Sequence, residues 1–318
     1  MKKFIFKLIK FLPFPILLTL VVGVIIHSYT QYCFEKGKKL PENIQTIFIG
    51  DSQFETGINP TFYNNSFSCS KSALQYKYVL AKLKYYTEQN DIDTAFVTLA
   101  YHSIFRVVDD KVKVVPQESL EQELSYNMPF IMNDEDLYKS FETVDNTFIF
   151  FKYKWLYKLG ILTKPLFIEL INTLQTHELS LKCVKGGFVS YSENHVTEGD
   201  FMKRFNGRKH LWGKLELIEQ NVNWLQKIMA YCHNKGIVLY FINTPLHKDL
   251  YEYNTILHTP TDSVVNKMVS KYDNVKYLNF SNIEFPEKGF KDHNHLNNWG
   301  AEIFTKLLRD SIVGLQTR

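Results

Sequence analysis

The sequence predicts an α/β protein in which helices cover both faces of a parallel sheet, behind an N-terminal membrane-spanning helix. Short apolar runs alternate with amphipathic helical segments at intervals of roughly 30 to 40 residues, which is typical of strand–helix–strand units. One long stretch, residues 103–213, lacks this alternation and indicates a large, mainly helical insertion in the body. An uncharged apolar run near the N-terminus indicates the membrane helix.

That run covers residues 11–26, FLPFPILLTLVVGVII, and with the apolar residues before it approaches the ~20 residues that cross a bilayer. No acidic residue lies in residues 1–27, and basic residues precede the run. Positive charge marks the cytoplasmic end of a membrane helix, so we expect a cytoplasmic N-terminus and an exported body. The basic residues are Lys2, Lys3, Lys7 and Lys10.

Two other interpretations of this segment are weaker. A cleaved signal peptide needs small residues at the cleavage site, but HSYTQYC follows Ile26, and the residues before Cys33 do not fit a lipoprotein signal. A buried helix of a soluble protein would leave the lysines without a role. The expected organisation is a cytoplasmic basic segment at 1–10, a transmembrane anchor at 11–27, a stalk at 28–44 and an α/β body at 45–318.

Within the body, apolar runs bounded by turn residues predict strands, and apolar residues at helical spacing predict helices. The clearest strands are expected at 46–50, 94–101, 237–245 and 275–280. Helices are expected at 72–88, 165–177, 214–235, 263–271 and 299–315. The aromatic run 148–160 carries three lysines and is too short to cross a membrane. We expect residues 103–213 to lie over the strand ends and not to form an independent domain.

Composition excludes several classes of function. Without the four N-terminal lysines, the remaining 33 basic residues equal the 33 acidic ones, so the body has no excess charge for a nucleic-acid partner. The four cysteines, Cys33, Cys69, Cys183 and Cys232, form no CxxC pair, and we expect buried core residues in preference to disulfides. No phosphate-binding or dinucleotide fingerprint is present, so no cofactor is implied.

Gly50-Asp51-Ser52 follows the first strand directly. Reactive groups of an open parallel sheet collect beyond the carboxyl ends of its strands, where a serine on a tight turn presents its hydroxyl to solvent. Alone, this tripeptide is also ordinary turn chemistry.

A second motif, DHNHLNNWGA, precedes the last helix, with Asp292 and His295 three residues apart. A histidine near a serine can take its proton, and a carboxylate on the other ring nitrogen fixes the tautomer. Taken alone, His295 is also compatible with metal binding or helix capping. The pairing of this motif with Ser52 at the opposite end of the body favours a catalytic arrangement.

Together these motifs resemble the SGNH (GDSL-like) hydrolase superfamily, which has a flavodoxin-like three-layer fold. GDSQFETGINP (50–60) is similar to the membrane-bound branch that includes the alginate O-acetylation and D-alanyl-transfer proteins. The resemblance implies Ser52 as nucleophile, His295 as general base and Asp292 as its orienting acid. It also implies acyl-ester chemistry on a cell-surface glycan, with acetyl as the expected group, and makes a membrane-bound acyl-carrying partner plausible.

The residues at the expected oxyanion hole differ from the pattern of that family. Ser52 supplies one backbone N–H, but SFSCSKSAL (66–74) has no glycine after the second strand, where the backbone N–H of Ser70 or a neighbour is the candidate donor. After the next strand, His102 lies where the family has asparagine, and either donates or packs. One lost donor typically costs ~10²–10³ in rate.

Other candidates lie near the same edge of the sheet. Asn243 and His247 follow a strand and are candidates for substrate contact, with a loop role as the alternative. Gly186-Gly187 and YSENHVTEG (191–199) are read as a surface loop or a substrate-facing loop. Besides an esterase or O-acyltransferase, the sequence is compatible with a non-catalytic binding or assembly protein and with a phospholipase-type hydrolase.

Overall fold

We describe the chain from a computed structural model, which covers residues 13–108, 124, 127–142, 147–158, 186–192, 210–211 and 213–316. The chain divides into two compact units, each described by itself. The first unit comprises Met1–Lys38 and Lys113–Val184, and the second comprises Lys39–Val112 and Lys185–Arg318.

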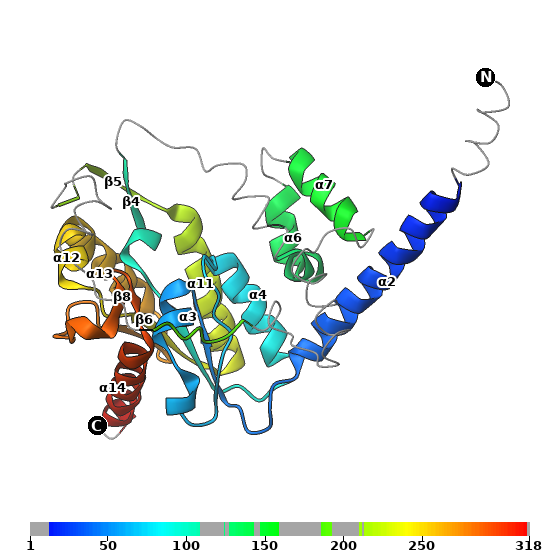
Figure 1. The fold of residues 1–318 in the computed structure, drawn as a ribbon. Helices are drawn as coiled ribbons and strands as arrows, with labels where there is room; N and C mark the ends of the chain where they lie inside the picture. The colour runs from blue at the N-terminus through cyan, green and yellow to red at the C-terminus, as the bar shows by residue number, and fades with distance from the viewer. Residues whose placement is uncertain are drawn as a thin grey trace. The chain divides into compact units, whose positions relative to one another are not determined.

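The second unit is built on a five-stranded sheet in the order β2-β1-β3-β6-β7, with every pair parallel (Figure 1). The predicted fold class, a parallel sheet between two layers of helices with an apolar N-terminal helix and a helical insertion, is therefore confirmed. The strands are β1 Thr46–Ile49, β2 Ser66–Ser68, β3 Thr94–Thr98, β6 Val238–Asn243 and β7 Val275–Asn279.

Helices occupy both faces of this sheet (Figure 1). The helices of the second unit are α3 Ser52–Gly57, α4 Tyr76–Thr87, α11 Glu219–Lys235, α12 Lys248–Tyr253, α13 Thr255–Val269 and α14 Asn298–Gln316. Three short 3₁₀ turns, at Pro60–Phe62, Tyr101–Ser103 and Glu287–Gly289, connect these elements.

One face of the sheet is a stacked aromatic ladder under α14. Phe48 of β1 stacks on Phe96 of β3 at 4.8 Å between ring centroids, and Phe96 stacks on Tyr240 of β6 at 5.0 Å. Phe304 and Leu308 of α14 belong to the same buried cluster. The ladder forms because alternate residues of neighbouring strands point to the same face in register. It holds α14, and the motif at its start, against the sheet.

The strand order reverses direction between β1 and β3, because the chain moves outward from β1 to β2 and then crosses back to β3. Open α/β sheets place their ligand sites at such a switch point, beyond the carboxyl ends of the strands. Ser52 follows β1 and His102 follows β3, so both residues lie at this edge.

Several predicted boundaries differ from the structure. Residues 214–217 are a strand, β5, and not the start of the 214–235 helix, because they pair antiparallel with β4, Phe105–Val108. The predicted helix at 263–271 begins earlier, at Thr255. The predicted helix at 165–177 lies outside the described residues. The strand β4 lies at the start of the predicted insertion and β5 follows its end, so their pairing brings the two ends of the insertion together.

The first unit contains α2, Pro13–Lys38, with α6, Glu135–Glu142, and α7, Thr147–Lys158. Among the described residues, α2 is the helix that is long and apolar enough to cross a membrane. It continues as helix through much of the predicted stalk. Near its carboxyl end, Gln31 Nε2 donates to the Tyr157 hydroxyl at 2.6 Å, and His27 packs edge-on against the same ring at 5.5 Å.

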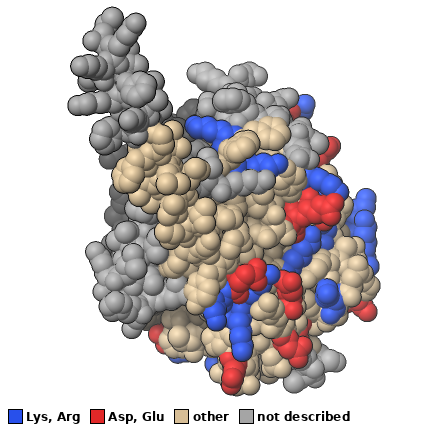
Figure 2. Space-filling model, turned by 90° about the vertical axis from the view of Figure 1, so that its right-hand side faces the viewer, with Lys and Arg blue, Asp and Glu red and all other residues tan. Residues whose placement is uncertain are grey.

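The cysteines and charges fit the sequence expectations where they are described. Cys33, Cys69 and Cys232 are buried thiols, whereas Cys183 lies outside the described residues. On the face seen in Figure 2, Lys and Arg side chains are interspersed with Asp and Glu.

Candidate active site

The turn after β1 depends on the absence of a side chain at Gly50. A Cβ built there would lie 2.6 Å from Thr98 Oγ1 on the adjacent strand β3. The close approach lets Thr98 Oγ1 accept a hydrogen bond from the Asp51 amide at 3.2 Å. Gly50 therefore allows β1 to end beside β3 and turn directly into α3, which begins at Ser52.

Asp51 caps this short helix. Its carboxylate accepts a hydrogen bond from the Gln53 amide at 3.0 Å, as an N-cap aspartate does. Burial raises the pKa of Asp51, while the nearby His102 and His295 act in the opposite direction. The cap fixes the first turn of α3 and with it the position of the Ser52 side chain.

Asp292 is held by the turn that it begins. Its Oδ1 accepts hydrogen bonds from the backbone amides of Asn294 at 2.8 Å and His295 at 3.1 Å. Both carboxylate oxygens lie 2.9 Å from His295 Nδ1. The D-x-x-H spacing therefore folds the carboxylate back onto the imidazole three residues later.

The other imidazole nitrogen, His295 Nε2, lies 2.7 Å from Ser52 Oγ. With its proton on Nδ1 and donated to Asp292, His295 can accept the serine hydroxyl at Nε2. The structure thus brings Ser52, His295 and Asp292 into one chain of hydrogen bonds, although Ser52 and His295 are 243 positions apart.

One further contact joins the two motifs, and another fixes the start of α14. Gln53 Nε2 donates to Asn294 Oδ1 at 2.7 Å, which joins α3 to the turn of Asp292. At the start of α14, Asn297 Oδ1 accepts a hydrogen bond from the Gly300 amide at 3.0 Å. A Cβ on Gly300 would overlap the backbone carbonyl of Gly289, so glycine is needed for this close packing.

The three candidate oxyanion donors differ in their surroundings. Ser52 N–H begins α3, and the first amides of a helix have no intrahelical acceptor. The Ser70 amide instead faces Ser68 Oγ at 3.5 Å inside the core, where the Ser70 hydroxyl also donates to the Phe48 carbonyl at 3.3 Å. His102 is exposed on the turn after β3, close enough to Asp51 to act on its pKa.

Asn243 and His247, the predicted substrate contacts, are both buried. Asn243 is 1% exposed at the end of β6. His247 caps α12, is 8% exposed, and packs edge-on against Phe290 and His293. Their burial places both side chains within the protein and away from its surface.

A segment that the sequence left as a loop borders the site. The Gly187 amide donates to the Ser70 carbonyl at 3.0 Å, and the Val189 amide donates to the Glu55 carbonyl of α3 at 2.7 Å. Gly186 approaches the same Ser70 carbonyl so closely that a Cβ would lie 2.5 Å from it. Gly186 and Gly187 therefore pack against the segment after β2, although they lie far from it in sequence.

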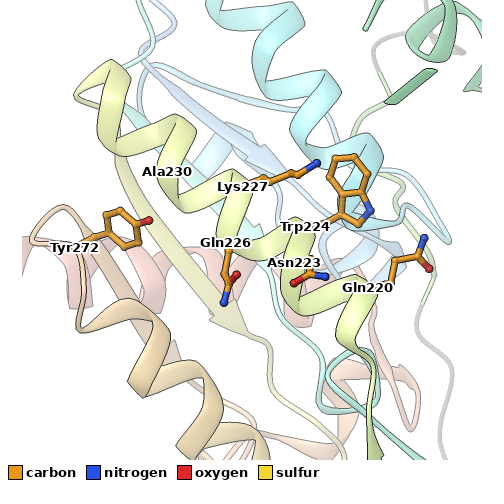
Figure 3. Close-up of a pocket in the computed structure, with 7 residues that line it drawn as sticks. All are labelled: Gln220, Asn223, Trp224, Gln226, Lys227, Ala230 and Tyr272. Atoms are coloured by element: carbon orange, nitrogen blue, oxygen red, sulfur yellow. The ribbon is translucent and has the colours of Figure 1, made fainter. Parts of the chain in front are cut away.

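A separate hollow of about 560 Å³ lies on the outer side of α11 (Figure 3). The triad of Ser52, His295 and Asp292 does not line it. It is bounded by polar and aromatic side chains, including Trp224 under the ammonium of Lys227 at 4.3 Å.

Comparison with known proteins adds little. No family model matches the chain, and no curated protein matches it. It is similar to a solved structure from Streptococcus pneumonia described provisionally as a platelet activating factor. The two share 10% identity with a TM-score of 0.43, over 96% of this chain and 98% of that chain. At this TM-score the similarity does not assign a function to the chain.

Proposed function

We propose that this chain is a membrane-anchored, extracytoplasmic serine esterase or O-acyltransferase of the SGNH type, acting on acyl esters of a cell-surface glycan. The observation that carries the proposal is the continuous contact from Ser52 Oγ through His295 to Asp292, at 2.7 and 2.9 Å. Ser52, His295 and Asp292 act as nucleophile, general base and orienting acid, respectively.

In this mechanism Ser52 Oγ attacks the ester carbonyl while His295 Nε2 takes the hydroxyl proton. Asp292 stabilises the imidazolium that forms and holds the ring in the reactive tautomer. His295 then returns the proton to the leaving alcohol, which leaves an acyl-serine. Water or a glycan hydroxyl attacks that ester, activated by the same histidine, and the choice of acceptor separates an esterase from a transferase.

The substrate class rests on the resemblance of the motifs and on the apolar helix α2. A domain held at the outer membrane surface meets glycans as they are exported or assembled, and acetyl is the group that we favour. A membrane-bound protein that delivers the acyl group is the partner that we expect.

The test uses the full chain in detergent with a chromogenic acetyl ester. We expect Ser52→Ala and His295→Ala to lower kcat by about 10⁴-fold or more, because each removes a triad member. Ser270→Ala, a serine at the exposed end of α13, is the matched control and retains full activity. Equal, negligible turnover by wild type and Ser52→Ala would exclude the esterase, and adding an acceptor glycan then tests for transfer.

A non-catalytic binding or assembly role is the second candidate. It is favoured by Ser70, the candidate oxyanion donor after β2, which is fully buried and whose backbone amide faces Ser68 Oγ at 3.5 Å. In that case, cells carrying Ser52→Ala or His295→Ala would keep the wild-type envelope, and removing residues 103–213 would alter it.

A further inference from the structure

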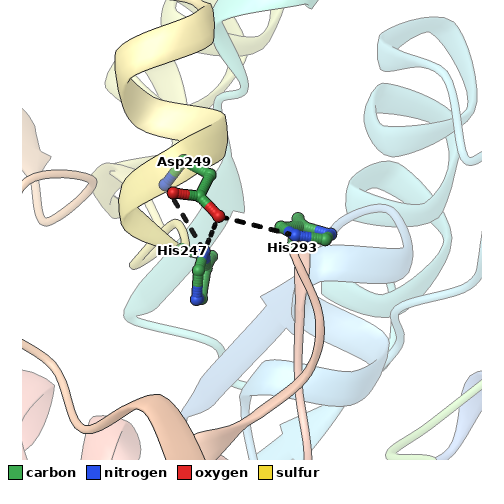
Figure 4. Close-up of side chains that lie close together, drawn as sticks. All are labelled: His247, Asp249 and His293. Atoms are coloured by element: carbon green, nitrogen blue, oxygen red, sulfur yellow. Dashed lines mark hydrogen bonds and ion pairs between the residues drawn. The ribbon is translucent and has the colours of Figure 1, made fainter. Parts of the chain in front are cut away.

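Next to the triad, three potential metal ligands converge from two segments of the chain. His247 and Asp249 lie at the start of α12, and His293 lies in the turn that joins Asp292 to His295 (Figure 4). One ligand atom from each residue lies within 4.8 Å of the other two. His247 Nδ1 is 3.5 Å and His293 Nε2 is 3.9 Å from Asp249 Oδ2.

These separations suit a single small ion. Zinc binds nitrogen and carboxylate oxygen at about 2.0 to 2.2 Å, so neighbouring ligands of a tetrahedral ion are roughly 3.4 Å apart. The distances from His247 Nδ1 and His293 Nε2 to Asp249 Oδ2 are close to that value, and a slight rotation of the side chains would bring them to it. Two imidazoles and one carboxylate leave the fourth position for water or another ligand.

The backbone holds the ligands in place. The His247 amide donates to the His293 carbonyl at 3.2 Å, which joins the two ligand-bearing segments directly. The side chains of His247 and His293 are 10% and 3% exposed, whereas that of Asp249 is 31% exposed. The cluster is thus shielded on the histidine side and reached from solvent beside the carboxylate.

Helix capping accounts for only part of this arrangement. The Asp249 amide donates to His247 Nδ1 at 3.4 Å, a long contact for a hydrogen bond. A cap needs one acceptor and no second histidine. His293 comes from a segment 44 to 46 positions away in sequence from the other two ligands, yet faces the same carboxylate.

We propose that His247, Asp249 and His293 bind one divalent transition-metal ion, zinc by its ligand set. The ion would tie the start of α12 to the turn that carries Asp292 and His295. The site is distinct from the triad, since it uses His293 and not His295, and zinc binding is independent of the proposed ester chemistry.

The test measures binding of Zn²⁺ alone to the metal-stripped full chain, by calorimetry and elemental analysis. We expect one zinc per chain, bound about 100-fold or more weakly in Asp249→Asn, His293→Gln and His247→Asn, each of which removes one ligand. His247→Asn retains a good helix cap, so its loss of zinc is not a loss of the cap. His233→Ala is the matched control, because His233 also faces an aspartate, Asp273, at 3.7 Å but is half exposed.

A second measurement needs no variant. Replacing zinc with Co²⁺ gives intense visible absorption when four ligands surround the ion and weak absorption when six do, and we expect the intense spectrum. The proposal is overturned if wild type binds no zinc, if the cobalt spectrum is weak, or if folded His247→Asn and His293→Gln bind zinc like wild type. Loss of zinc from Ser52→Ala or His295→Ala with retention in those two variants would place the ion at the triad instead.

Discussion

At the scale of single residues, the site depends on how Asp292 distributes its hydrogen bonds. Two backbone amides of its own turn and the imidazole of His295 converge on one carboxylate. The carboxylate is therefore oriented before any substrate arrives, and it orients the ring in turn. His293, one residue from Asp292, turns toward Asp249 instead, which explains why the D-x-x-H spacing and not simple proximity selects His295.

His258 gives a residue-scale prediction about pH. It lies between the rings of Tyr101 at 4.4 Å and Tyr251 at 4.1 Å, and burial lowers its pKa despite the nearby Asp262. The His258 imidazole is therefore protonated more readily in the unfolded chain than in the folded chain. Stability from this group is present above the ordinary histidine pKa of 6.5 and is lost as the pH falls through the lower folded value.

We expect His258→Phe, which keeps an aromatic ring between the tyrosines, to lose less stability on acidification than wild type. Denaturant unfolding at pH 7.5 and pH 5 would measure the difference, with His233→Phe as the exposed control. An unchanged dependence on pH in His258→Phe would contradict the argument.

At the scale of elements, α14 is positioned by one glycine. Gly300 lies where the helix meets the backbone of Gly289, and any Cβ would collide with a carbonyl that cannot rotate away. We expect Gly300→Ala to lower the free energy of unfolding by about 1 to 3 kcal/mol and to lower kcat, because the turn of Asp292 moves with the start of the helix.

Gly314 on the same helix is the control, since nothing lies within 4 Å of its built Cβ. Gly314→Ala should be neutral or stabilising by up to about 1 kcal/mol, from helix propensity alone. Similar losses of stability in Gly300→Ala and Gly314→Ala would contradict this explanation, in which glycine is needed at position 300 for the close approach to Gly289.

The sequence predicted elements whose pattern is local and missed those set by distant partners. The four clearest strands of the sheet are continuous apolar runs, and the apolar spacing of α4, α11 and α14 is visible directly. Lys214–Leu217 was misread because Leu215 and Ile218 continue the helical spacing of α11, and only pairing with β4 makes it a strand.

Some contacts of the candidate site could likewise be predicted from the sequence, and others could not. The proximity of Ser52 to His295 could be predicted because both motifs lie at elements that the fold brings to one sheet edge. Gly186 beside the Ser70 carbonyl could not, since nothing in the sequence between them indicates that approach. The convergence of His247 with His293 likewise comes from a backbone hydrogen bond and ring packing between distant segments.

At the scale of the whole molecule, part of the insertion groups with the apolar N-terminal helix. Within that unit, Tyr157 of α7 contacts His27 and Gln31 near the end of the apolar stretch of α2. α7 also exposes Phe151 at 42% and Trp155 at 64%. Aromatic residues flanked by lysines are typical of helices at the membrane surface.

The proposed orientation in the membrane rests on the lysines before α2. We expect a C-terminal alkaline phosphatase fusion in a bacterial host to be active and a C-terminal fluorescent-protein fusion to be dark, because the proposed location of the body is outside the cytoplasm. Replacing Lys2, Lys3, Lys7 and Lys10 with alanine should weaken this preference. A bright fluorescent fusion with inactive phosphatase would place the body in the cytoplasm and contradict the proposed location.

The central claim is that Ser52 is an activated nucleophile, and covalent labelling tests it most directly. A fluorophosphonate reacts with a serine whose proton is taken by a neighbouring base. We expect a single adduct on the peptide that contains Ser52. It should be absent from Ser52→Ala and should form much more slowly in His295→Ala. No adduct on wild type, or an adduct that persists in Ser52→Ala, would contradict it.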